Sequence, residues 1–142
     1  MRAVVTRVKE ARVEIEGVVR GAISQGYLVL LGVGQHDTDE DARRLAEKIF
    51  HLRVFADEAG KMNLDISQIG GKILAISQFT LYANLKSRRP GFTEAAAPDL
   101  AKPLYEKFMM YLEELGVKVQ RGEFGADMQV YSLNDGPVTL VF

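Results

Sequence analysis

A chain of 142 residues with 47% hydrophobic and 26% charged residues is long enough to bury a substantial core, and we expect one domain over residues 1–142. The formal net charge of −1 excludes a broad basic face for nucleic acid, so any contact with a polyanion should be small and local. No apolar run approaches the roughly 20 residues of a membrane helix, and the absence of cysteine excludes disulfides and thiolate catalysis and is compatible with a cytoplasmic location.

The first third of the chain has the patterns of β-strands. Residues 2–9 alternate in character and predict a strand, and Val13 and Ile15 alternate with charged neighbours in the same way. Glu16-Gly17 then offers a hairpin turn into a strand over 18–23. The denser apolar run over 27–33 is typical of a strand buried on both faces.

A helix and a central strand follow. Acidic residues at 37–39 and apolar residues at helical spacing predict an amphipathic helix over 39–52. A short strand over 53–56 and a turn come next, and 63–66 is left unassigned or as a short strand. The apolar run over 72–79 predicts a central strand.

The last part of the chain predicts a second helix and three closing strands. Residues 82–97 look irregular, because Pro90 and Gly91 break any regular element. Pro98 and Asp99 open a helix that Gly116 ends, and strands are expected over 117–120, 128–133 and 138–142. The helix should turn one stripe inward: Leu100, Leu104, Phe108, Tyr111, Leu112 and Leu115.

The order of these elements predicts the fold class. Two helices cannot serve about eight strands in alternating units, so a doubly wound sheet of the Rossmann type is not expected. A mixed α/β fold fits better, with two packed β-sheets and the two helices on one side. Unpaired edge strands on such a sheet would favour dimerisation.

The chain lacks the usual catalytic groups. His36 lies beside a predicted turn and His51 inside the first helix, and neither sits in a metal-binding pattern. There is no Gly-x-Ser-x-Gly elbow, phosphate loop or dinucleotide fingerprint. We therefore expect no metal and no cofactor, and no Ser-His-Asp triad is supported.

The segment Ser77-Gln78-Phe79-Thr80-Leu81 lies where the central strand runs out of apolar residues. One interpretation is structural, with Ser77 and Thr80 capping the strand and Phe79 in the core. In the functional alternative, exposed backbone N–H groups form an oxyanion hole while Ser77 and Gln78 bind substrate.

Two further segments allow a structural and a functional interpretation. Gly136-Pro137 interrupts an apolar strand pattern, which indicates either a simple turn or a rigid wedge of backbone. The stretch Lys86-Ser87-Arg88-Arg89 is the one dense basic segment. A solvated loop is its simpler interpretation, and the functional alternative is that Lys86, Arg88 and Arg89 meet nearby phosphates.

Taken together, Ser-Gln-Phe-Thr-Leu at 77–81 and Asn-x-Gly-Pro-Val-Thr at 134–139 resemble the D-aminoacyl-tRNA deacylase family. The resemblance extends over the full length. It includes Arg7-Val8, the run Gly60-Lys61-Met62-Asn63-Leu64, and Phe124-Gly125-Ala126-Asp127-Met128.

The resemblance implies a homodimer with active sites at the subunit interface. The substrate would be the ester between an amino acid and the 3′-terminal adenosine of tRNA, either a D-aminoacyl ester or glycine mischarged on alanine tRNA. Ser77, Gln78, Phe79 and Thr80 would line the pocket, and Gly136-Pro137 would carry a cis bond and enter the neighbouring subunit's pocket to exclude L side chains. Phe124 and Met128 would pack around the adenosine, and Arg7 would steady the Gly-Pro segment.

Physical chemistry is compatible with this implied activity. The terminal ribose has a vicinal hydroxyl that can activate water, and an aminoacyl ester is already reactive, so positioning and oxyanion stabilisation suffice as a mechanism. Three alternatives stay open: Thr80 as a covalent nucleophile, which needs an activating base; a generic esterase; and a non-catalytic module that binds RNA ends.

Overall fold

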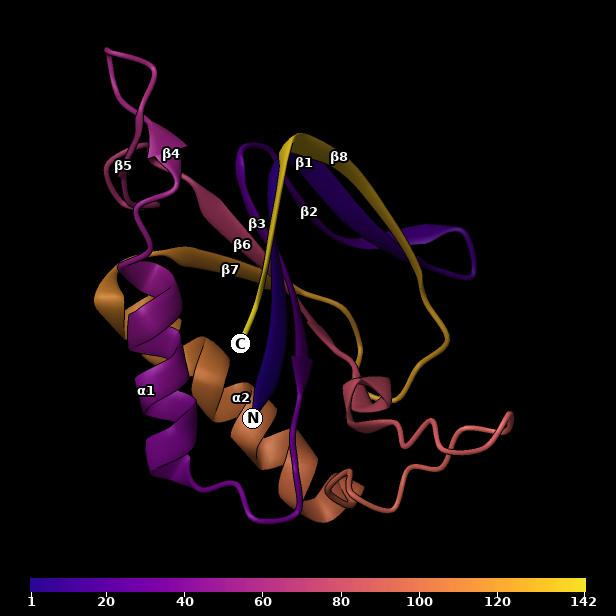
Figure 1. Cartoon of the computed structure of the whole chain (residues 1–142). Helices are drawn as coiled ribbons and strands as arrows, with labels where there is room; N and C mark the ends of the chain where they lie inside the picture. Colours follow the sequence, from indigo (N-terminus) through magenta and orange to yellow (C-terminus); the bar gives the residue numbers. More distant parts are fainter.

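A computed structural model describes all residues 1–142 and contains eight strands, two α-helices and one 3₁₀ turn (Figure 1). The strands are β1 (Arg2–Ile15), β2 (Val18–Ile23), β3 (Gly26–Gly32), β4 (Phe55–Ala56), β5 (Met62–Leu64), β6 (Lys72–Ser77), β7 (Lys118–Arg121) and β8 (Gln129–Val141). The helices are α1 (Asp39–Phe50) and α2 (Pro98–Leu115), and the 3₁₀ turn is η1 (Phe79–Tyr82). Neither helix is long and apolar enough to cross a membrane.

Six strands form one mixed sheet. Its order is β2-β1-β3-β6-β7, and β8 pairs with β1. The pairs β3–β6 and β6–β7 are parallel, whereas β1 is antiparallel to β2, β3 and β8. Strands β4 and β5 form a small second sheet. The prediction of a mixed α/β fold, distinct from a doubly wound one, is confirmed.

Both helices lie on the same side of the large sheet (Figure 1). Their apolar residues and one face of the sheet enclose the main core, in which Tyr27, Val29, Ile73 and Ala75 alternate along β3 and β6. The opposite faces of these strands belong to a second cluster with Leu28, Leu74 and Ile76, which Val13 of β1 and Ile23 of β2 cover. The bent strand β1 therefore carries β2 across the face that the helices leave free.

Local signals explain where α1 begins. Thr38 is the N-cap, and Thr38 and Asp41 form a reciprocal capping box ahead of three acidic residues in the first turn. Ala42, Leu45 and Ile49 are buried, as their spacing predicts. The predicted helix extended to residue 52, whereas α1 ends at Phe50 with His51 as C-cap.

The second helix has the predicted bounds but a different buried face. Leu104, Phe108 and Leu112 are buried as expected. The prediction for Leu100 is wrong, because it is 37% exposed and Ala101 is buried in its place. The buried residues of α2 are Ala101, Leu104, Tyr105, Phe108, Met109 and Leu112. They repeat three and four residues apart, and Leu100 comes one position before the first of them, so its side chain points away from the core.

Two predicted strands at the N-terminus are one continuous strand. Residues 2–8 of β1 pair with β3, and residues 11–15 pair with β2. The backbone of β1 stays extended throughout. The alternation of apolar and charged residues is interrupted between the two predicted strands because β1 changes its partner there, and not because the strand breaks.

The two closing strands around Gly136-Pro137 are also one strand, β8, and the prediction of a break there is wrong. Val8 pairs with Asn134 and Thr6 with Thr139, so four residues of β8 bulge outward opposite Arg7. Because bulged residues leave the ladder, the missing N–H of proline costs no strand pairing.

Strand β6 ends two residues earlier than predicted. It stops at Ser77, after which the Leu81 N–H bonds to the Gln78 carbonyl at 3.2 Å and the Ala83 N–H to the Thr80 carbonyl at 3.0 Å. These bonds form η1, so the predicted strand residue Phe79 belongs to a turn, which leads into the irregular segment expected after residue 82.

Candidate active site

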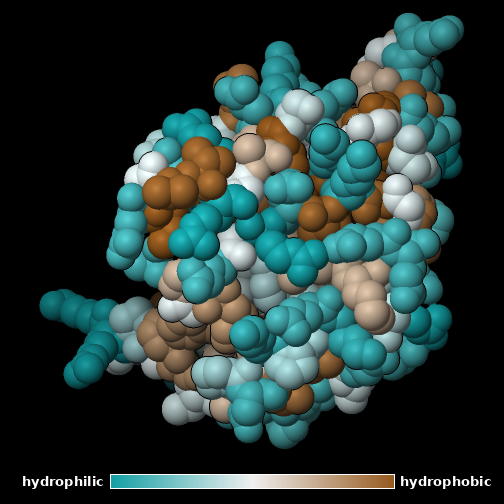
Figure 2. Space-filling view, turned by 180° about the vertical axis from the view of Figure 1, so that it is seen from behind, coloured by the Kyte–Doolittle hydropathy of each residue, from teal (hydrophilic) through white to brown (hydrophobic).

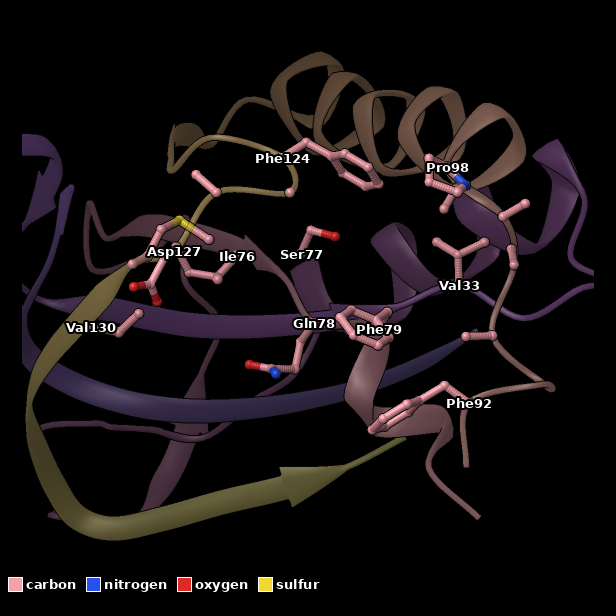
Figure 3. Close-up of a pocket in the computed structure, with 17 residues that line it drawn as sticks. Val33, Ile76, Ser77, Gln78, Phe79, Phe92, Pro98, Phe124, Asp127 and Val130 are labelled. Carbon is pink, nitrogen blue, oxygen red and sulfur yellow. The ribbon is translucent and has the colours of Figure 1, made fainter. Parts of the chain in front are cut away.

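A cavity of about 630 Å³ lies at the carboxyl ends of the three parallel strands β3, β6 and β7 (Figure 3). Val33 follows β3, Ser77 ends β6, and Phe124 follows β7. Ligands in open α/β sheets bind at this edge, because loops rather than strand ladders surround it. Twelve of the 17 lining residues are hydrophobic, so the cavity suits a ligand with a large apolar surface.

The cavity brings together two segments that are about fifty positions apart in the sequence. Ser77, Gln78 and Phe79 come from the end of β6 and the start of η1. Phe124 and Met128 come from the loop between β7 and β8. Figure 3 shows Ser77 and Phe124 on facing sides of the cavity. Five of the nine residues singled out in the sequence therefore line one cavity.

Thr80 has a different environment. It is exposed and lies outside the lining of the cavity, and its hydroxyl Oγ1 accepts a hydrogen bond from Nε2 of Gln78. No histidine, lysine or carboxylate forms a hydrogen bond with this hydroxyl. A threonine nucleophile needs an adjacent base, which this geometry does not provide.

Backbone N–H groups at the end of β6 are available to a ligand. The Gln78 N–H bonds to the Leu31 carbonyl at 2.7 Å, which fixes the end of the strand. Phe79 and Thr80 are the first two residues of η1, and the first N–H groups of such a turn have no partner within the turn. The segment therefore presents donors beside the cavity wall that Ser77, Gln78 and Phe79 form.

Two glycines of β3 and the loop after it allow η1 to lie close to the sheet. A Cβ on Gly32 would meet Leu81 Cβ at 3.0 Å and the Gln78 carbonyl at 3.1 Å, and one on Gly34 would meet the Tyr82 ring at 2.8 Å. Arg2 holds the turn from the other side, because its Nη1 donates to the Leu81 carbonyl at 2.8 Å and its guanidinium lies over the Tyr82 ring.

Aromatic contacts support the cavity walls. The Tyr105 hydroxyl donates to the Ala75 carbonyl of β6 at 2.8 Å, and its ring lies 6.1 Å from that of Phe124. Burial raises the pKa of Tyr105 to about 12, so this hydroxyl stays a donor at neutral pH. On the other wall, the rings of Phe79 and Phe92 meet edge to face at 5.0 Å.

Arg7, Gly136 and Pro137 lie together but outside this cavity. Arg7 Nε donates to the Asp135 carbonyl at 3.2 Å and lies 3.4 Å from its carboxylate, and Arg7 Nη1 donates to the Val54 carbonyl. Gly136 and Pro137 are exposed, and the peptide bond between them is cis. The structure thus brings Arg7 to the Gly-Pro segment and keeps both away from the chain's own cavity.

Asp127 is the only ionisable residue that lines the cavity, and no role was predicted for it from the sequence. Its position beside Met128 in the same short loop was the one available signal. His36 and His51 are exposed and line no part of the cavity. No group of three or more histidine, aspartate or glutamate side chains is arranged to hold a metal ion.

The molecule is thus a mixed α/β protein whose cavity offers backbone donors and small polar side chains and contains no catalytic triad. The model of the D-Tyr-tRNA(Tyr) deacylase family matches residues 4–142. The chain is 57% identical to the D-aminoacyl-tRNA deacylase of Thermus aquaticus over 99% of its length and 93% of that protein. It is 56% identical to that of Thermosipho africanus, over 99% of its length and 95% of that protein.

A solved structure of the c-Myc DNA Unwinding Element Binding Protein matches with a TM-score of 0.95 at 39% identity, and the match covers 100% of this chain and 97% of that one. The chain belongs to the D-Tyr-tRNA(Tyr) deacylase family. It is therefore an enzyme, a hydrolase of the ester bond in D-aminoacyl-tRNA, which excludes the non-catalytic module considered above.

Proposed function

We propose that this deacylase holds the 3′-terminal aminoacyl-adenosine in the cavity at the end of β6 and rejects L-aminoacyl esters sterically. The observation that carries the proposal is the meeting of Ser77-Gln78-Phe79 with Phe124 and Met128 in one apolar cavity. Phe124 and Met128 supply apolar surface for the adenosine, and Ser77 and Gln78 supply polar groups near the ester.

In the proposed mechanism, the RNA supplies the reactive assistance. Backbone N–H groups at Phe79 and Thr80 stabilise the oxyanion that forms when water attacks the ester carbonyl. The vicinal hydroxyl of the terminal ribose orients or activates that water. The carbonyl–oxygen bond to the ribose then breaks, the leaving ribose oxygen takes up the proton that the attacking water gives up, and free amino acid and tRNA are released. Asp127 is the only ionisable side chain in the cavity lining, and no histidine or lysine is present there, which supports this division of labour.

Selection of handedness is assigned to Gly136 and Pro137 of a second subunit. D and L esters carry the same groups, so attraction discriminates poorly between them, whereas a rigid backbone placed where an L side chain projects excludes it by overlap. The exposure of this segment and its place outside the lining of the chain's own cavity support a role in another copy. Arg7 fixes the segment through the Asp135 carbonyl. Glycine has no side chain to clash, so glycine on alanine tRNA is also a substrate.

A homodimer is supported by the surface of β8. This strand pairs only with β1, so its other edge is unpaired over 13 residues. It exposes Val130, Tyr131, Leu133 and Val141, which are 39%, 43%, 52% and 81% exposed. An unpaired strand edge of this length and exposed apolar side chains on the same strand both favour association with a second chain.

The test compares matched D-tyrosyl and L-tyrosyl esters of tRNA, together with a D-tyrosyl ester on tRNA that ends in 2′-deoxyadenosine. We expect hydrolysis of the D ester, survival of the L ester, and a rate at least 100-fold lower on the deoxy substrate. Equal hydrolysis of the two enantiomers would refute steric selection, and full activity on the deoxy substrate would refute assistance by the ribose and favour a generic esterase.

The variant Gly136→Ala tests the selecting segment. A Cβ at this position, where φ is +118°, would meet Arg7 Nη2 and Val138 Cγ2, each at 3.0 Å, so the segment must shift. We expect D-ester activity to fall at least tenfold and discrimination to weaken. Gly60→Ala is the matched control, because its φ is +78° and a Cβ there meets nothing within 4 Å. Equal behaviour of the two variants would leave the segment with no specific role and contradict the proposal.

A further inference from the structure

The loop between η1 and Phe92 has a charge pattern that the proposed reaction does not use. It carries Lys86, Arg88 and Arg89 within four positions, in a chain whose formal net charge is −1. All three residues are exposed, and none takes part in an ion pair. Glu94, the nearest acidic residue along the chain, forms no ion pair with them. The loop is therefore a local concentration of free positive charge.

Internal hydrogen bonds give the loop a defined shape. Its base is closed by the Asn84 N–H to the Gly91 carbonyl at 2.7 Å and the Gly91 N–H to the Asn84 carbonyl at 3.0 Å. Toward the tip, Asn84 Oδ1 accepts the Lys86 N–H at 3.0 Å, and Ser87 Oγ donates to the Arg89 carbonyl at 2.7 Å. These bonds use backbone and short polar groups, so the charged ends of the three side chains keep all their donors for an outside partner.

Residues of the cavity wall flank the loop. It follows η1, whose first residue is Phe79, and Phe92 comes directly after it. The rings of these two residues meet at 5.0 Å and both line the cavity. Figure 2, which views the molecule from behind, shows at its lower left a hydrophilic projection beside a hydrophobic surface; this side corresponds to the lower right of Figure 1, where the loop lies.

We propose that Lys86, Arg88 and Arg89 bind phosphates of the nucleotides that precede the terminal adenosine of the tRNA. The inference rests on the proposed function, because it takes the aminoacyl-adenosine to occupy the cavity, from which the rest of the RNA strand must leave past its rim. Arginine binds phosphate with two donors in fixed geometry, and lysine binds it as a point charge. A near-neutral protein thereby holds RNA through a few contacts at one place.

The test uses the triple variant Lys86→Gln/Arg88→Gln/Arg89→Gln. The matched control is Arg44→Gln/Lys61→Gln/Lys118→Gln, which removes three exposed cations of α1, the β4–β5 turn and β7. Each variant loses three positive charges, so the formal net charge falls from −1 to −4 in both. Two substrates are compared: D-tyrosyl-tRNA, and the D-tyrosyl ester of adenosine, which has no phosphate.

We expect the loop variant to raise KM for D-tyrosyl-tRNA about tenfold or more while its activity on the adenosine ester stays within twofold of the wild type. Three phosphate contacts to a single strand give a plot of log(1/KM) against log[salt] a slope of about −2. The loop variant should therefore lose most of the salt dependence of KM that the wild type shows for D-tyrosyl-tRNA. The control triple should match the wild type on both substrates. An equal loss in the control triple, or an equal loss on the adenosine ester, would overturn the assignment.

Binding of uncharged tRNA separates this inference from the proposed function. If the wild type hydrolyses neither D ester, the proposed function fails, whereas the loop is still tested by the salt dependence of tRNA binding in the two triple variants. If uncharged tRNA binds the loop variant and the wild type equally at 50 mM salt, the loop assignment fails even when hydrolysis is normal.

Discussion

At the scale of single residues, the cavity is unusual for a hydrolase because one carboxylate, that of Asp127, is its only ionisable group. A general base contributes a factor of about 10² to 10⁴ to a rate, so removal of one is readily measured. The proposed assistance by the ribose assigns no proton transfer to Asp127. The threonine hydroxyl at position 80, which bonds to Gln78 outside the cavity lining, has no proton-transfer role either.

We therefore predict that Asp127→Asn and Thr80→Ala each keep kcat on D-tyrosyl-tRNA within about fivefold of the wild type, because neither side chain transfers a proton in the reaction. Single-turnover deacylation with purified, folded variants measures this directly. A loss of more than about 100-fold in Asp127→Asn would identify a general base, and the same loss in Thr80→Ala would identify a nucleophile.

At the scale of elements, the sharp start of α1 depends on a capping box. The Thr38 N–H donates to Asp41 Oδ2 at 2.8 Å, and the Asp41 N–H donates to Thr38 Oγ1 at 3.4 Å. Two hydrogen bonds from Thr38 lower the pKa of Asp41 below its ordinary value of 3.8; the bond from the backbone has the larger effect and the bond from the side chain the next. The folded state therefore releases the Asp41 proton at a lower pH than the unfolded chain does.

The sign of the pH dependence follows from this lowered pKa. The ionised Asp41 carboxylate stabilises the folded state through these hydrogen bonds. This stabilisation is fully present above the pKa of Asp41 in the unfolded chain, near 3.8, and is lost as the pH falls through the lower pKa of Asp41 in the folded state. We predict that Thr38→Ala reduces the free energy of unfolding by about 1 kcal/mol at pH 7. The difference between wild type and Asp41→Asn should shrink below pH 4. Urea denaturation at several pH values measures both, and a difference that grows on acidification would contradict the capping assignment.

At the scale of the whole molecule, the exposed apolar side chains of β8 predict a dimer. The variant Leu133→Asp places a charge on this surface of β8, at a position that is 52% exposed. The control is Met62→Asp, which places a charge in β5, away from β8, at a position that is 59% exposed. A charge buried in an apolar interface is costly, so only Leu133→Asp should dissociate the dimer.

Sedimentation measures the outcome against the chain mass of 15.8 kDa. We expect the wild type and Met62→Asp to sediment at about twice this mass, and Leu133→Asp at the monomer mass with lost rejection of L esters. A wild type that stays monomeric at micromolar concentration, or a monomeric Leu133→Asp that still rejects L esters, would rule out selection by a second subunit.

Local patterns were sufficient for most elements of the fold. Helical spacing and the signals around Thr38, Pro98 and Gly116 identify both helices, and alternation identifies most strands, because these signals depend on neighbours a few positions away in the chain. The failures occurred where distant partners decide. Pairing with β1 lets β8 continue through Gly136-Pro137, and an offset of one residue turns Leu100 outward and Ala101 inward.

The sequence by itself determined the mixed α/β class, the two helices and the two motifs that indicate the family, since each of these is written in short contiguous runs. Only the tertiary structure decided that residues near 77 and near 124 form one cavity, that Asp127 is its sole ionisable side chain, and that Gly136-Pro137 lies outside it beside Arg7. The physical reason is that a cavity at the carboxyl ends of parallel strands is assembled from loops far apart in the chain, whose meeting depends on how the sheet is ordered.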